Sequence, residues 1–184
     1  IFLIVAVAGL LYATGAGGKA ATRPAEPRTR PAAGSTTQPS TQPTSKPTRL
    51  QVVIDTNLGP MVVELDEQRT PATVKNFLQY VDDRFYDGVI FHRVLQGFMI
   101  QVGGFTTDLR PKKPPYPPVV NESREAAGNT RGTIAMARTN HPDSATSQFF
   151  INHSDNRQLD TYGGGYTVFG RVVEGMEVVD KIAK

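Results

Sequence analysis

Residues 91–105 read FHRVLQGFMIQVGGF and determine how the rest of the chain is interpreted. β-branched and aromatic residues on both sides of Gln96-Gly97 predict two short strands, 89–94 and 98–102, joined by a tight turn. Because alternate residues of a strand share a face, the pattern places Phe91 beside Arg93 and Met99 beside Gln101. We therefore expect an apolar surface that carries a guanidinium and a carboxamide. The alternative is an Arg93 that pairs with a distant carboxylate and has a structural role only.

A second informative stretch is TIAMARTNHPDSATSQFFI, residues 133–151. Its ends, 133–137 and 148–151, predict strands on either side of a polar loop. Together, FHRV…GFMIQ and MAR…SQFFIN resemble the cyclophilin family of peptidyl-prolyl isomerases, in its bacterial extracytoplasmic form. The resemblance covers about residues 50–184, and the two blocks occur in the family's order and spacing.

Composition excludes several other classes of protein. The chain has 184 residues and no cysteine, so neither disulfides nor thiolate sites are available. Of its 20 Lys and Arg residues, five lie in residues 1–48 with a single acidic residue, which leaves 15 basic and 16 acidic residues in 49–184. The globular part therefore lacks the basic surface expected of a nucleic-acid-binding protein.

The first 48 residues divide into two segments of different composition. Residues 1–16 begin with the apolar run IFLIVAVAGLLY and predict a signal-peptide core or the end of a membrane anchor, rather than a buried helix of the domain. Residues 17–48 contain six Pro and ten Ser or Thr but no Val, Ile, Leu, Met or aromatic residue. Such a segment cannot bury enough apolar surface to fold, so we predict a disordered, extended linker that forms an N-terminal membrane tether.

The remaining residues, 49–184, predict one domain. Strands are expected at 50–56, 61–65 and 166–173, and helices after Thr70-Pro71 and over 175–183. This pattern predicts a mainly β fold with a closed or nearly closed antiparallel sheet. The resemblance implies an eight-stranded cyclophilin-like barrel capped by two helices. It also implies a closing C-terminal strand that is missing from this chain, so we expect residues 50–56 to have an unpaired edge.

The residues present exclude most covalent chemistry. The hydrolase motif G-x-S-x-G is absent, and His92, His141 and His153 lack metal-ligand spacing. Isomerisation of an X–Pro bond needs no covalent intermediate and no cofactor. Its barrier, about 20 kcal/mol, arises from amide resonance. An apolar pocket for the ring and a donor to the prolyl nitrogen would lower it, and the residue types present can supply both.

The resemblance assigns roles to individual residues. It implies that Arg93 is the donor, that Gln101 binds the substrate backbone, and that Gln148 supports the groove. The implied proline pocket and groove consist of Phe98, Met99, Phe150, Leu159, Ala137, Arg138 and Tyr166. Where the family often has an aromatic residue before this Leu, the chain has Gln158, which predicts weak binding of the cyclic peptide cyclosporin.

We accordingly predict a monomeric prolyl isomerase that acts as a folding chaperone on proline-containing polypeptides outside the cytoplasm. The alternative is a non-catalytic peptide-binding module with the same pocket. A binding module needs the pocket but not the arginine, so the presence of Arg93 favours the enzyme.

Overall fold

The computed structural model describes the backbone of residues 5–11 and both backbone and side chains of residues 50–184. The predicted linker and the other residues before Leu50 lie outside the described part. Eight strands form one antiparallel sheet in the order β1-β2-β3-β8-β6-β7-β5-β4. Their bounds are β1 (Val5–Leu11), β2 (Gln51–Thr56), β3 (Gly59–Leu65), β4 (Arg93–Leu95), β5 (Met99–Val102), β6 (Thr133–Met136), β7 (Phe149–Asn152) and β8 (Val168–Glu174).

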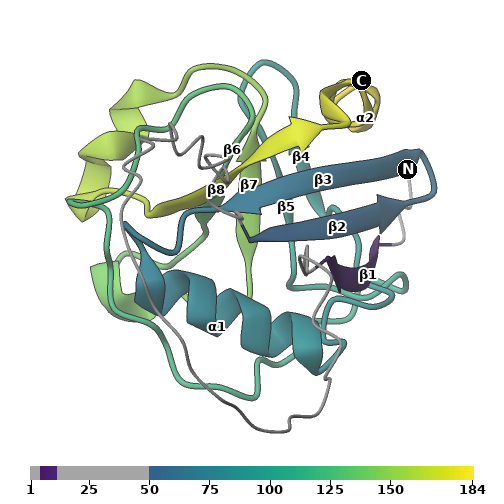
Figure 1. Ribbon diagram of the computed structural model, residues 1–184, viewed down its shortest axis with the longest axis horizontal. Helices are drawn as coiled ribbons and strands as arrows, with labels where there is room; N and C mark the ends of the chain where they lie inside the picture. Colours follow the sequence, from purple (N-terminus) through teal and green to yellow (C-terminus); the bar gives the residue numbers. More distant parts are fainter. Residues whose placement is uncertain (1–4, 12–49) are drawn as a thin grey trace, which may run out of the picture. The chain divides into compact units, whose positions relative to one another are not determined.

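Two α-helices accompany the sheet, as predicted. Helix α1 (Pro71–Asp82) and helix α2 (Met176–Ile182) lie at different ends of the strands (Figure 1), and buried residues of both belong to the same core cluster. Three short 3-10 helices occur in the loops, namely η1 (Pro142–Ser144), η2 (Arg157–Asp160) and η3 (Tyr162–Gly164). No helix in the described part of the chain is long and apolar enough to cross a membrane.

Helix α1 begins where the sequence predicts, but its cap comes from another residue. Thr70 occupies the N-cap position and makes no side-chain cap hydrogen bond. Instead the Glu122 carboxylate accepts from the backbone N–H groups of Ala72 and Thr73, at 3.1 and 2.8 Å, and from the Thr73 hydroxyl at 2.6 Å. A carboxylate at this helix end satisfies free donors and faces the positive end of the helix dipole. Glu122 thereby links the loop that contains it to the start of α1.

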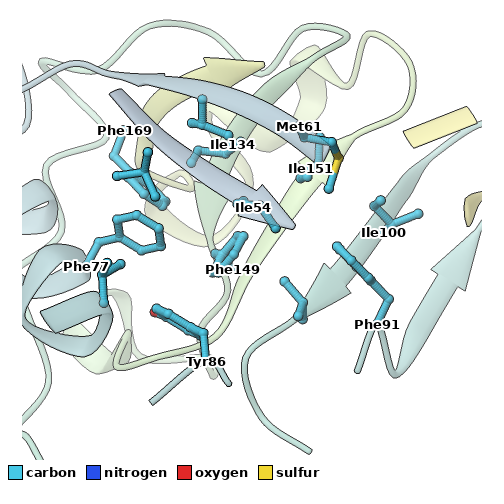
Figure 2. Packing of buried hydrophobic residues seen from close by; sticks show 14 of the residues in the cluster. Ile54, Met61, Phe77, Tyr86, Phe91, Ile100, Ile134, Phe149, Ile151 and Phe169 are labelled. Atoms are coloured by element: carbon cyan, nitrogen blue, oxygen red, sulfur yellow. The ribbon is translucent and has the colours of Figure 1, made fainter. Parts of the chain in front are cut away.

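Aromatic rings fill the core between α1 and the sheet. Phe77 of α1 packs edge-on against Phe149 of β7, with ring centroids 5.4 Å apart, and Tyr86 packs against both rings (Figure 2). The Tyr86 hydroxyl donates to the Ser147 carbonyl at 2.8 Å, so this buried polar group is satisfied. Burial raises the pKa of Tyr86 well above its ordinary value.

The structure corrects two predictions about strands. Residues 89–94 were expected to form one strand, but β4 contains only Arg93–Leu95, and Val89 makes an isolated bridge to Thr106. The regular alternation therefore stops before Phe91, which packs in the core with Ile100 rather than beside Arg93 (Figure 2).

The second correction concerns the edge of β2, which was expected to have no partner. Strand β1 pairs with it antiparallel, with Val5 opposite Thr56 and Leu11 opposite Gln51. The apolar run contains the β-branched residues Val and Ile, which suit a strand, and β2 offers free backbone groups to it. This pairing does not test the interpretation of residues 1–16 as a signal or anchor segment, which stays a prediction.

Candidate active site

A second apolar cluster lies apart from the main core and contains most of the predicted pocket. Its buried members are Met99, Ala135, Phe150, Leu159 and Val168. Partly buried residues pack against it, namely Phe98, Ala126, Ala127, Ala137 and Tyr166. Six of the predicted site residues thus come together: Phe98, Met99, Ala137, Phe150, Leu159 and Tyr166.

Strand alternation explains why this cluster is separate from the core. In β7, Phe149 and Ile151 face the core, whereas Phe150 between them faces the opposite side. Phe150 lies opposite Gln101 of β5 and opposite Ala135 of β6. One face of three adjacent strands therefore builds the core, and the other builds the second cluster.

Polar side chains form a chain of hydrogen bonds along the border of this cluster. Arg93 Nη1 donates to Gln101 Oε1 at 3.4 Å, and Gln101 Nε2 donates to Gln148 Oε1 at 2.9 Å. Arg93 lies directly opposite Gln101 in the ladder between β4 and β5. Its guanidinium is exposed and forms no ion pair with any of the described residues. The alternative of a structural ion pair for Arg93 therefore has no support in residues 50–184.

The glycine pair after β5 allows Gln148 to approach. A Cβ atom at Gly104 would lie 2.5 Å from the Gln148 side chain, and one at Gly103 would lie 2.6 Å from the Ser147 carbonyl oxygen. Gly103 also has φ +92°, in the region that favours glycine. Gln148 is thereby held against the backbone with its carboxamide directed to Gln101.

His92 lies beside this polar chain and is half-buried. Its ring packs against Phe105, with centroids 4.6 Å apart. Burial lowers the pKa of His92, and hydrogen bonding to the Ile90 backbone and to Gln148 opposes this effect only in part. His92 is therefore neutral near pH 7.

Arg138 borders the cluster, but its donors are occupied. Its guanidinium lies 4.3 Å from the Tyr166 ring centroid and donates to the carbonyl oxygens of Gly163 and Gly165, both at 2.9 Å. Tyr166 in turn packs edge-on against Phe150, with centroids 5.8 Å apart. Arg138 thus holds the loop around η3 and the Tyr166 ring in place.

Leu159 reaches the cluster from the 3-10 helix η2, an element that the sequence pattern did not indicate. The backbone N–H of Tyr166 donates to the Leu159 carbonyl at 3.0 Å, and Asp160 accepts from the backbone and side chain of Asn129 at 2.6 and 2.9 Å. Gln158, just before it, is exposed.

Sequence reasoning missed four members of the cluster, and two of them lie in a loop. Ala126 and Ala127 carry no distinguishing side-chain chemistry, and no periodic pattern surrounds them. The other two are Ala135 and Val168. Ala135 could have been found from alternation, since Ala135 and Ala137 share a face of the strand predicted at 133–137.

The described residues contain no group of three or more side chains suited to hold a metal ion. The site therefore combines an apolar cluster, an exposed arginine donor and two carboxamides. It can receive an apolar ring and donate hydrogen bonds beside it, but it offers no nucleophile.

Comparison with known proteins identifies the family of the chain. Residues 51–184 match the family model described as cyclophilin type peptidyl-prolyl cis-trans isomerase/CLD. Peptidyl-prolyl cis-trans isomerase A of Dickeya dadantii is 53% identical over 140 residues, which cover 74% of this chain and 73% of that protein. Peptidyl-prolyl cis-trans isomerase B of Escherichia coli is 50% identical over 136 residues, 71% of this chain and 82% of the relative.

The fold is likewise similar to that of solved structures. A cyclophilin type peptidyl-prolyl cis-trans isomerase of Cryptosporidium parvum, crystallised in the presence of the dipeptide Ala-Pro, has a TM-score of 0.62 and 30% sequence identity. The match covers 73% of this chain and 85% of that one.

Proposed function

This chain belongs to the cyclophilin-type peptidyl-prolyl cis-trans isomerase family, and we propose that it isomerises X–Pro bonds on the face formed by β4, β5 and β7. The observation that carries this proposal is the second apolar cluster, which lies apart from the core and beside the exposed Arg93. We assign the proline ring to the wall formed by Phe98, Met99, Phe150 and Leu159.

The chemistry of the reaction explains the need for both parts. Rotation about the X–Pro bond removes amide resonance, and the prolyl nitrogen then gains lone-pair character. A planar amide nitrogen accepts almost no hydrogen bond, whereas the twisted one does. A donor at this position therefore stabilises the transition state more than the ground state and lowers the barrier.

Arg93 is the residue that we assign as this donor. Within residues 50–184, Nη1 alone is engaged, at 3.4 Å from Gln101, and no carboxylate there competes for the guanidinium. Gln101, fixed by Gln148 at 2.9 Å, is assigned to the substrate backbone. Arg138 and Ala137 border the groove, and Arg138 acts by holding Tyr166.

Phe98 offers the sharpest test of the pocket, because it is only partly buried and its truncation leaves the core intact. Phe98→Ala should weaken binding of a short X–Pro peptide and lower kcat/KM, measured by NMR exchange between cis and trans peptide. The control is Leu109→Ala, which truncates a residue that is 60% exposed and belongs to neither cluster. Equal activity of Phe98→Ala and the control would remove Phe98 from the site.

The same assay separates the enzyme from a binding module. Wild-type protein that binds the peptide without accelerating its exchange would leave the pocket in place and refute the assignment of Arg93. If Phe98→Ala loses both peptide binding and the acceleration of cis–trans exchange, the result would support catalysis at the proposed pocket.

We further propose that the domain works as a monomer outside the cytoplasm, tethered or secreted through residues 1–48. The apolar composition of residues 1–16 and the six prolines of residues 17–48 support this proposal. Cell fractionation and mass spectrometry of the mature N-terminus test it. Recovery of the protein with the cytoplasmic fraction and an uncleaved N-terminus would refute it.

A further inference from the structure

The turn between β4 and β5 is where the proposed pocket meets a second network of polar contacts. Gly97 has φ +74°, and Phe98 N–H donates to the Leu95 carbonyl at 3.0 Å. The turn places Phe98 at the cluster and joins the strands that carry Arg93 and Gln101. Any shift of this turn would therefore move a wall of the pocket relative to the donor.

Residues just after β7 hold this turn on both of its sides. His153 Nδ1 accepts from the Gly97 N–H at 2.9 Å, and the Ser154 hydroxyl donates to the Gly97 carbonyl at 2.5 Å. The Phe98 carbonyl accepts from the His153 N–H at 2.9 Å and from Asn156 Nδ2 at 2.8 Å. Of these bonds, only the one to His153 Nδ1 depends on a titratable side chain.

The other nitrogen of His153 fixes the tautomer. His153 Nε2 lies 3.1 Å from Asp180 Oδ1, and Arg131 Nη2 donates to the two oxygens of Asp180 at 2.7 and 2.9 Å. The hydrogen bond from Arg131 holds the pKa of Asp180 below its ordinary value, so the carboxylate stays charged and accepts the Nε2 proton. Nδ1 is then bare and able to accept, because a neutral imidazole has one donor and one acceptor nitrogen.

We propose that His153 is a positioning residue, which holds the β4–β5 turn, and with it Phe98, in the catalytic arrangement only in its neutral form. This inference rests on the proposed function of Phe98 as a wall of the proline pocket. Protonation puts a hydrogen on Nδ1, where it meets the Gly97 N–H, and the turn loses this anchor.

The charged groups around His153 come from elements other than the turn. Asp180 faces it from α2 and Arg131 from the loop before β6, and Asp155 accepts from the Arg131 backbone N–H at 2.8 Å. The turn itself, residues 96–98, carries no titratable side chain. Of these ionisable side chains, only His153 contacts the Gly97 N–H.

Two substitutions separate the two nitrogens of the imidazole. His153→Asn places an oxygen acceptor where Nδ1 lies and removes the contact to Asp180. His153→Gln keeps a group near Asp180 but has no acceptor at the position of Nδ1. We expect the Asn variant to keep most of the wild-type kcat/KM and the Gln variant to lose about three- to tenfold, the range of one ordinary hydrogen bond.

The pH dependence supplies a readout that a merely structural role would not move. In wild-type protein, kcat/KM should fall and the NMR shift of the Gly97 amide proton should move as His153 protonates at acid pH. In His153→Asn the movement of the Gly97 amide shift should disappear, and kcat/KM should keep only the part of its acid fall that other groups such as His92 cause. Equal losses in the Asn and Gln variants, or a Gly97 titration unchanged by His153→Asn, would overturn the proposal.

The experiment distinguishes this inference from the proposed function. The amide titration of Gly97 needs no substrate, so it tests the contact even if Phe98 has no catalytic role. Normal activity of Phe98→Ala would refute the pocket, whereas a wild-type enzyme that depends on Phe98 but not on Nδ1 of residue 153 would refute only the positioning role.

Discussion

Replacing Arg93 with alanine should separate catalysis from folding more cleanly than any other change to this site. The side chain is exposed, and its hydrogen bond to Gln101 is 3.4 Å long. An exposed contact of this kind is worth little, so the free energy of unfolding should change by no more than about 0.5 kcal/mol. Nothing in the core packs on Arg93, since Phe91 rather than Arg93 faces inward.

The effect on the transition state should be much larger. Removing one preorganised donor from such a site costs about 10²–10³ in rate, or ~3–4 kcal/mol. Arg93 is exposed in the free protein, and water screens the interaction between its charge and the prolyl nitrogen. We therefore expect a loss at the lower end of this range, about 10². Gln101 cannot fully replace Arg93, because one of its two Nε2 hydrogens already donates to Gln148 and a neutral carboxamide is a weaker donor than a guanidinium.

The assay compares kcat/KM from cis–trans exchange with the Kd of the same peptide. Arg93→Ala should lower kcat/KM with little change in Kd, and Arg93→Lys should restore only part of the rate, because an ammonium lacks the planar fork. Arg110→Ala is the matched control, since Arg110 is an exposed arginine paired with Asp108 at 2.7 Å. Near-normal exchange by Arg93→Ala, or a loss that follows unfolding in urea, would refute the reasoning.

Three further predictions concern other parts of the domain. Glu122→Ala removes the acceptor for the Ala72 and Thr73 N–H groups and should cost about 1–2 kcal/mol in urea unfolding, whereas an unchanged midpoint would show that water replaces the cap. Because the pKa of His92 is lowered in the folded state, the unfolded chain binds the proton more readily, and stability should fall as pH drops below about 6.5. His92→Asn should flatten this fall in thermal unfolding measured across pH, and an equally steep fall would assign it to other groups. Gln158→Trp should tighten inhibition by cyclosporin in a titration without changing the isomerase rate, and no tightening would count against the assignment of Leu159.

Much of the site was predictable because its residues lie on regular strands. Met99, Gln101 and Phe150 follow the two-residue alternation of β5 and β7, so their faces can be read from the sequence. The individual roles came from the resemblance to the family, since an aromatic residue in a strand is more often core than pocket.

The parts that could not be predicted depend on contacts distant in sequence. The irregular backbone before β4 turns Phe91 into the core, which strand alternation alone could not indicate. The Glu122 cap joins residues 49 and 50 positions apart. Pairing of β1 with β2 needed a free edge and an apolar segment, but composition alone pointed to a membrane role for that segment. The contact between His153 and Gly97 spans 56 positions of sequence, and nothing near either residue indicates it.

Phe149 and Phe150 are neighbours in the chain, yet Phe149 belongs to the core and Phe150 to the second apolar cluster. Phe150 belongs to the pocket that we propose, so substitutions there should change which residues it accepts without first disturbing the packing around α1. Substrate specificity can therefore diverge during evolution while the fold is retained. Insertion of one residue before this pair would exchange the faces of Phe149 and Phe150. Specificity can therefore change through substitutions at this position, whereas an insertion would disturb the core.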